Sequence, residues 1–100
     1  MKLKAAFIFI ASQANPNINR TIVDTPNVEL TVVGVDNYRE AESVAIELSE
    51  QGITSIELCA AFGIEGTAII NKAVKGKSIV GAVRFDNHPG FDFKSGDDIF

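Results

Sequence analysis

The stretch Ala5-Ala6-Phe7-Ile8-Phe9-Ile10-Ala11 decides the fold class, because every side chain in residues 5–11 is apolar. A strand that lacks alternating polar residues has both faces covered, as in a parallel sheet with helices on each side. The run is far shorter than the roughly 20 residues that a membrane-spanning helix requires. We therefore expect an α/β protein built around this strand.

Three more apolar runs, in residues 28–35, 53–62 and 78–85, predict further strands downstream of the first. Helix-like patterns separate the runs, and strands that alternate with helices form parallel sheets through right-handed crossovers. The sequence thus predicts a single α/β domain over residues 1–100, a small three-layer βαβαβαβ arrangement with a four-stranded, mostly parallel sheet. Residues 91–100 are expected to form an extra strand or a flexible tail.

The first predicted helix follows Asn15-Pro16, where asparagine is a typical N-cap and proline suits the first helical position. It would end by Thr25, because a proline follows and disfavours helical geometry in the residue before it. Its apolar side chains Ile18 and Ile22 are spaced so that both would face the sheet.

The second predicted helix is capped by Asn37, with Glu40 placed to reach back from the first turn, and Gly52 ends it. The third follows the glycine-rich turn in residues 63–67 and ends at Gly76. The side chains of these two helices that are expected to face the sheet are Ala41, Val44, Ala45, Leu48, Ile69, Ile70, Ala73 and Val74.

The charge and the cysteine count exclude several classes of function. A formal net charge of −4 disfavours nucleic acid and anionic membranes as partners, because both require a basic surface. One cysteine permits no intramolecular disulfide, and one histidine leaves too few ligands for a zinc site. We therefore predict no metal site of that kind, and leave open a Mg²⁺ or Ca²⁺ ion held by carboxylates. Asp97 and Asp98 are interpreted as solubilising charges.

Lys2 and Lys4, which precede the first apolar run, are also typical of a short signal peptide. We favour the strand, because the run spans only seven residues and turn-forming residues follow it directly. With a single cysteine and no candidate membrane span, the chain is expected to be cytoplasmic.

Ligands of open parallel sheets bind beyond the carboxyl ends of the strands. At that edge, the glycines of the turn in residues 63–67 would admit an anion to the free N–H groups of a helix N-terminus. The expected ligand is a small anionic metabolite; the alternative is a tight turn without a ligand, which the negative charge of Glu65 favours. The candidate ligand-binding residues are Gly63, Glu65, Gly66, Thr67, Asp86 and His88.

Cys59, Asp86 and His88 are the candidate catalytic residues, since all three follow predicted strands at the same edge. A thiolate near a helix N-terminus with a histidine as its base suits nucleophilic catalysis, and Asp86 would suit a general base. The alternative is structural, because a lone cysteine in an apolar strand is usually a small buried hydrophobe and Asp86 could cap the turn after it. The sequence identifies no cofactor.

Two motifs carry a resemblance to a known family: Glu57-Leu58-Cys59 with Phe62-Gly63 and Glu65-Gly66-Thr67, and Val83-Arg84-Phe85-Asp86 with His88-Pro89-Gly90. On these residues the chain resembles a family of short, uncharacterised prokaryotic α/β proteins, classed as a domain of unknown function. The resemblance extends to about Gly90. It implies that the loops in residues 59–67 and 86–90 are the distinctive part of the family, and it implies no activity.

Three functions remain. The first is a small-molecule binding domain for an anionic metabolite, with its site at the carboxyl ends of the strands. The second is a structural or interaction protein acting as a homodimer, because a four-stranded sheet has two exposed edges that a second subunit or the tail would cover. The third is a small enzyme, which one short sheet with a shallow cleft disfavours. We expect the first and keep the other two as alternatives.

Overall fold

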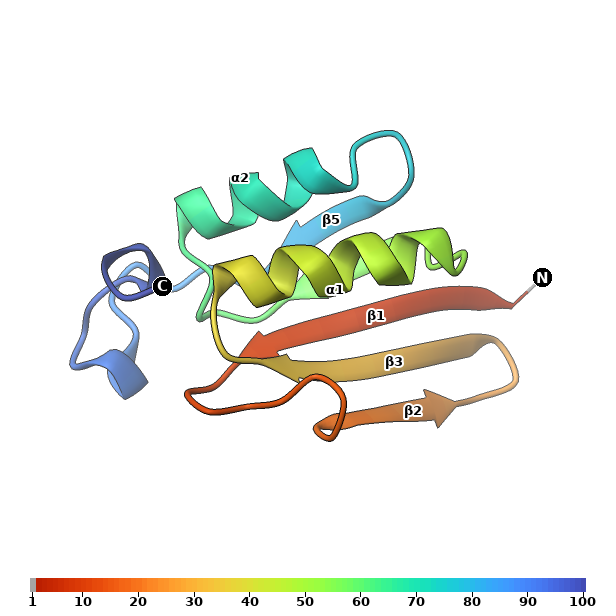
Figure 1. The fold of residues 1–100 in the computed structure, drawn as a ribbon, viewed down its shortest axis with the longest axis horizontal. Coiled ribbons are helices and arrows are strands. Elements are labelled where there is room, and N and C mark those ends of the chain that lie inside the picture. Colours follow the sequence, from red (N-terminus) through yellow and green to blue (C-terminus); the bar gives the residue numbers. More distant parts are fainter. Residues whose placement is uncertain (1) are drawn as a thin grey trace.

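In the computed structural model, which describes residues 2–100, β1 (Leu3–Ile10) is the central strand of a five-stranded sheet (Figure 1). It pairs in parallel with β3 (Val28–Val35) on one side and with β4 (Ser55–Leu58) on the other. β4 pairs in parallel with β5 (Ile79–Ala82), and β2 (Arg20–Asp24) pairs antiparallel with β3. The sheet is therefore mixed but mostly parallel, in the order β2-β3-β1-β4-β5.

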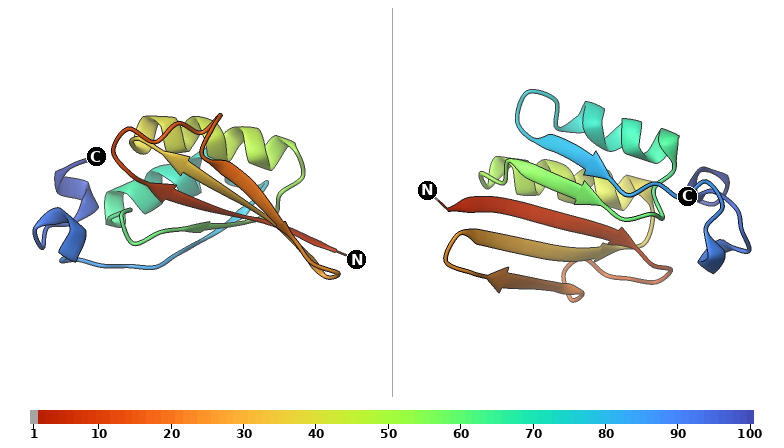
Figure 2. Two further views of the ribbon diagram at one scale, coloured as in Figure 1. Left: turned by 90° about the horizontal axis from the view of Figure 1, so that it is seen from below. Right: turned by 180° about the vertical axis from the view of Figure 1, so that it is seen from behind.

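Both helices, α1 (Tyr38–Glu50) and α2 (Ile64–Ala73), lie on the same face of this sheet (Figure 2). The strand register places Ile8 of β1 beside Val33 of β3 and Leu58 of β4 on that face, and all three side chains are fully buried. The core is thus a single layer of side chains between the sheet and the two helices.

The start and end of α1 follow the sequence prediction closely. Asn37 Oδ1 accepts a hydrogen bond from the Glu40 N–H at 2.9 Å, and Glu40 Oε1 accepts one from the Asp36 N–H at 2.8 Å. Gly52 follows the helix with a φ of +90°, a conformation that glycine adopts without strain. The predicted apolar stripe is confirmed, since the helix buries Ala41, Val44, Ala45 and Leu48.

The prediction for α2 is confirmed in part. Ile70 and Val74 are fully buried, and Ala73 packs against the core. Ile69, which was expected to face the sheet, is instead 38% exposed. Gly76, which was predicted to end this helix, lies just beyond it with a φ of +83°, a conformation that glycine adopts without strain.

The prediction of a first helix was wrong. The same error explains why four strands were predicted where the sheet has five. The Asn15 carbonyl does accept a hydrogen bond from the Asn19 N–H at 2.7 Å, so one helical turn forms. The chain then enters β2, whose Ile22 is 56% exposed and does not pack inward, and Ile18 is 74% exposed. The β-branched residues of β2 gain more by pairing with the free edge of β3 than a short helix would gain.

The expected three-layer βαβαβαβ arrangement was also wrong, because the second face of the sheet carries no helix within residues 2–100 (Figure 2). The connections β3–α1–β4 and β4–α2–β5 advance across the sheet in the same direction. Right-handed crossovers in one direction place their helices on one face. A helix between β1 and β3 would have covered the other face. The chain forms β2 there instead.

Residues 91–100 form no strand in the described chain; they continue a tail that begins after β5 and contains 3-10 turns at Pro89–Phe91 and Gly96–Asp98. The tail lies beyond the carboxyl ends of β1 and β5 (blue in Figure 1). A single bridge pairs His88 with Lys94 inside it. Between residues 2 and 100, neither helix has the length and apolar character needed to span a bilayer.

Candidate functional site

At the carboxyl end of the sheet, the N-terminus of α2 is occupied by the side chain of Asp97 from the tail. The Asp97 carboxylate accepts hydrogen bonds from the N–H groups of Glu65 at 3.0 Å and Gly66 at 3.1 Å. The sequence predicted that an anion would bind these N–H groups. In the structure that anionic group is a carboxylate of the chain itself, and Asp97 is thus a helix cap as well as a surface charge.

Tyr38, the first residue of α1, connects the two helices through its hydroxyl group. The hydroxyl donates to Asp97 Oδ1 at 2.9 Å and accepts from the Gly63 N–H at 3.0 Å. The ring stacks on Phe62, with centroids 5.7 Å apart. Burial, reinforced by the charge of Asp97, raises the pKa of Tyr38 to about 12, so the hydroxyl keeps its proton at neutral pH.

The glycines of this region are required by close contacts within the chain. A Cβ atom on Gly63 would lie 2.2 Å from the Asp97 carboxyl carbon, and one on Gly66 would lie 2.3 Å from the Tyr38 ring. A Cβ atom on Gly96 would lie 1.7 Å from the Ala61 carbonyl oxygen. Side chains of the tail and of α1 therefore fill the space that larger residues would need in place of Gly63 and Gly66.

Next to the contact between the tail and the start of α2 is a small pocket of about 260 Å³. It is lined by Gly63, Ile64, Thr67, Ala82 and Arg84. It lies between the start of α2 and the end of β5, and it includes two of the predicted ligand-binding residues. Glu65, a third, is exposed.

Asp86 and His88 each have partners close by in the sequence. Asp86 accepts hydrogen bonds from the Arg84 guanidinium at 2.8 and 3.4 Å, and this interaction raises the pKa of Arg84. His88 Nδ1 accepts from the Gly90 N–H at 2.9 Å, and its ring stacks on Phe91 with centroids 4.2 Å apart. Both contacts stabilise the turn between β5 and the tail.

Cys59 lies just after β4 and is half-buried against the core. Its sulfur atom accepts hydrogen bonds from the N–H groups of Ile10 and Ala61, both at 3.4 Å. Within residues 2–100, the hydrogen bonds of Cys59 and of His88 do not join the two residues. The thiol thus helps to order the loop before α2.

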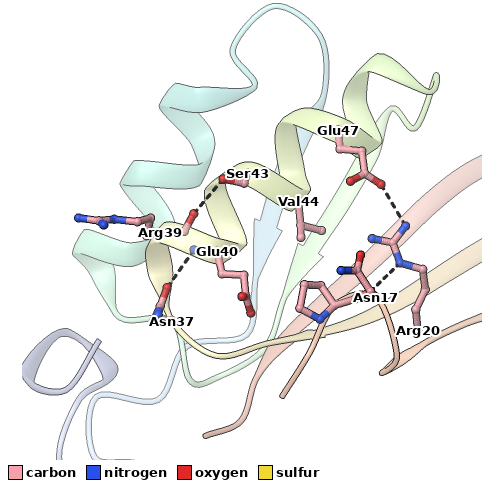
Figure 3. Close-up of a pocket in the computed structure, with 9 residues that line it drawn as sticks. Asn17, Arg20, Asn37, Arg39, Glu40, Ser43, Val44 and Glu47 are labelled. Atoms are coloured by element: carbon pink, nitrogen blue, oxygen red, sulfur yellow. Dashed lines mark hydrogen bonds and ion pairs between the residues drawn. The ribbon is translucent and has the colours of Figure 1, made fainter. Parts of the chain in front are cut away.

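A polar cleft of about 440 Å³ lies between α1 and the loop that joins β1 to β2 (Figure 3). Its polar side chains come from both elements, and the sequence reasoning missed the site because it placed a helix where this loop and β2 lie. The cleft begins at Asn37, just beyond the carboxyl end of β3, and extends along α1 as far as Glu47; none of the predicted ligand-binding residues lines it. The residues that line it are Pro16, Asn17, Arg20, Asn37, Arg39, Glu40, Ser43, Val44 and Glu47.

Arg20 is a cation of this polar cleft that hydrogen bonds hold in place. Its Nε donates to the Pro16 carbonyl at 3.0 Å and its Nη1 donates to Glu47 Oε1 at 3.1 Å (Figure 3). The side chain is 28% exposed, against 49% for that of Glu47. Arg39 is exposed at the other end of the cleft, on the first turn of α1.

A second hollow, of about 530 Å³, lies at the amino ends of β1 and β3, where Lys2, Lys4 and Glu29 line it. Ligands of parallel sheets bind at the opposite edge. Across residues 2–100, the histidine, cysteine and acidic side chains form no group of three or more that could hold a metal ion.

The sequence model of one protein family, described as a family of unknown function (DUF6506), matches residues 3–98. The match confirms the resemblance to an uncharacterised family and extends it beyond Gly90 into the tail. No curated protein and no solved structure matches the chain.

Proposed function

The chain belongs to the DUF6506 family of unknown function, and on that premise we propose that it binds a small anionic metabolite at the carboxyl end of its sheet. The observation that carries the proposal is the polar cleft, in which two arginines, two asparagine amides and a serine hydroxyl line one cleft of about 440 Å³. That volume lies within the range of pockets that hold small ligands.

Arg20 supplies the group that would recognise the anion. A guanidinium has five N–H donors in a planar fork that matches a carboxylate or a phosphate. The hydrogen bonds to Pro16 and Glu47 use two of these donors and fix the position of the group. An arginine held in this way loses little conformational entropy when an anion binds to its remaining donors.

The glutamates of the cleft restrict the chemistry of the ligand further. Glu47 pairs with Arg20 and Glu40 also lines the cleft, so a ligand with only acidic groups would be repelled by these two carboxylates. A metabolite that carries an anionic group together with hydroxyl or ammonium donors satisfies both kinds of side chain. Small hydroxy acids, amino acids and sugar phosphates have this combination.

The small pocket beside α2 is the second candidate position for the same ligand class. It includes Gly63 and Thr67 and adds the guanidinium of Arg84. An anion that bound there would compete with Asp86 for Arg84, and the α2 N–H groups would become available only if Asp97 moved away. The polar cleft needs no such displacement of the tail.

A thermal-shift panel of carboxylates, amino acids, inorganic phosphate and sugar phosphates tests the proposal. A ligand present at 100 times its dissociation constant adds about 2.7 kcal/mol to the free energy of unfolding. For a domain of this size, the melting temperature should then rise by about 10 °C or more. A panel that leaves the melting temperature unchanged contradicts the proposal.

Three arginine variants locate the site. Arg20→Gln and Arg39→Gln should abolish or strongly reduce the ligand-induced shift, while Lys75→Gln, an exposed cation outside the cleft, should retain it. Loss of the shift in Arg84→Gln alone would assign the ligand to the pocket beside α2 and overturn the cleft as the site.

A further inference from the structure

The charged side chains of the polar cleft define its ligand more narrowly, and we propose that the ligand is an amino acid whose ammonium group lies several bonds from its carboxylate. The proposal rests on the function proposed above, because the carboxylate would bind Arg20 in the same cleft. The ammonium group would bind Glu40, at the start of α1.

The formal charges of the cleft cancel, since two arginines and two glutamates line it. Arg20 and Glu47 already form an ion pair with each other at 3.1 Å. Within residues 2–100, no cation forms an ion pair with Glu40. An anion that binds Arg20 therefore enters a cleft in which one carboxylate still lacks a positive partner.

Glu40 is held in a position from which it can bind a cation. Its Oε1 accepts a hydrogen bond from the Asp36 N–H at 2.8 Å, and its own N–H donates to Asn37 Oδ1 at 2.9 Å. Among residues 2–100, its Oε2 accepts no hydrogen bond, and the residue is half-buried. Because the side chain is already fixed, little conformational entropy is lost when Oε2 binds a ligand.

An ammonium group satisfies Glu40 better than a hydroxyl group does. A ligand that fills the cleft removes water from this carboxylate, and a charge that loses water is costly unless an opposite charge and hydrogen bonds replace the water. A hydroxyl donates one hydrogen bond, whereas an ammonium group has three donors and a full positive charge. At Arg20, a carboxylate is favoured over a phosphate monoester, because the ester places about two negative charges beside Glu47.

The helix sets the distance between the two ends of the ligand. Glu40 and Glu47 are about 10 Å apart along the axis of α1, and Arg20 is bonded to Glu47 at one end of this span (Figure 3). After a hydrogen bond of about 3 Å at each end, roughly 4 to 6 Å remains for the ligand. Three or four methylene groups between carboxylate and ammonium span this distance, and Val44 lies between the two glutamates as an apolar contact for them.

Titration calorimetry on the wild-type chain compares 4-aminobutanoate with 4-hydroxybutanoate, which has nearly the same length but a hydroxyl in place of the positive charge. The amino acid should bind at least tenfold more tightly. Glycine, whose two charged groups are separated by one carbon, is too short to reach from Arg20 to Glu40. It should bind at least tenfold more weakly than 4-aminobutanoate.

Glu40→Gln is the decisive variant, because glutamine can still accept the hydrogen bond from the Asp36 N–H but carries no charge. It should weaken the binding of 4-aminobutanoate at least tenfold and leave that of 4-hydroxybutanoate unchanged. Glu50→Gln is the matched control, since it makes the same change at an exposed residue of α1 outside the cleft. It should leave the binding of both compounds unchanged.

Equal affinities of the wild-type chain for 4-aminobutanoate and 4-hydroxybutanoate overturn the inference, and so does a Glu40→Gln variant that binds 4-aminobutanoate as tightly as the wild type does. In either case the proposed function stands if another anion of the thermal-shift panel binds and Arg20→Gln abolishes its binding. If no compound of the panel or of this series binds, both the inference and the proposed function are wrong.

Discussion

The hydroxyl of Tyr38 and the carboxylate of Asp97 show how individual residues connect distant parts of the chain. They are 59 positions apart in sequence, yet their side chains form one hydrogen bond of 2.9 Å at the start of α2. Sequence reasoning recognised the free N–H groups of that helix as a place for an anion. It could not identify Asp97 as the anionic group, because nothing local to Asp97 indicates which helix it will meet.

Replacement of Asp97 by asparagine tests this contact through its pH dependence. Burial alone would raise the pKa of Asp97, but the N–H groups of Glu65 and Gly66 and the Tyr38 hydroxyl outweigh it and lower the pKa below 3.8. The ionised carboxylate therefore stabilises the folded state above about pH 4, and this contribution is lost as the pH falls through the lowered pKa.

Asp97→Asn should lower the free energy of unfolding at neutral pH by about 0.3–1 kcal/mol, the typical contribution of a negative charge at a helix N-terminus. Urea denaturation of both proteins should show the difference shrinking below about pH 4. Asp98→Asn is the control, because Asp98 accepts from the Ser95 N–H inside the tail and does not bond α2. If the difference in free energy of unfolding between the two proteins does not change with pH, the charge of Asp97 does not contribute to stability.

Among the elements, α2 begins in close contact with both α1 and the tail. Its N-cap residue Gly63 has no side chain to cap the helix, so Asp97 performs that function from the tail. Gly66 in the first turn has a lower helix propensity than a larger residue would have, and the Tyr38 ring occupies the space where a side chain would lie. The element is thus stabilised by its neighbours more than by its own sequence.

Gly66→Ala tests this balance within α2. Alanine favours a helix interior over glycine by about 1 kcal/mol, so propensity alone predicts a more stable protein. We expect the reverse, a loss of about 1–3 kcal/mol, because the new Cβ atom would overlap the Tyr38 ring. Thermal denaturation should show a lower melting temperature for Gly66→Ala, with Gly81→Ala, which has open space around it, near wild type. A stabilised Gly66→Ala would contradict the packing.

β2 is the element for which local reasoning failed, and the physical reason is competition. Asn15 and Pro16 start a helical turn as predicted, but the following Thr21, Ile22 and Val23 favour a strand. The turn between β2 and β3 is closed by a 2.8 Å hydrogen bond from the Thr25 N–H to the Val28 carbonyl. A short two-residue turn between β-branched runs is typical of a β-hairpin. Here the hairpin forms in place of the helix that the single N-cap predicted.

In the whole molecule, the tail closes the carboxyl end of the sheet. Phe100 lies 6.0 Å from the Tyr38 ring and 5.4 Å from Phe91, measured between centroids, and so connects the last residue to both α1 and the turn after β5. Asp97 of the same tail caps the start of α2. The edge of the sheet where ligands were predicted is thus partly closed by the chain itself.

Deletion of residues 95–100 should lower the free energy of unfolding by about 2–3 kcal/mol, the sum of a helix cap and a partly buried aromatic side chain. Chemical denaturation measures this loss, and Phe100→Ala separates the aromatic part from the cap. A truncated chain as stable as the full one would show that the tail packs only loosely.

The α/β class, the mostly parallel sheet and both ends of α1 could be predicted from the sequence, because apolar runs, caps and glycines act over a few neighbouring residues. It also indicated that the carboxyl edge of the strands is crowded with glycines. That residues 20–24 form β2 follows from tertiary contacts, since the edge with which this strand pairs lies on β3. The same holds for the position of both helices on one face and for the contact of the tail with α2, which depend on crossover direction and on contacts between residues far apart in the chain.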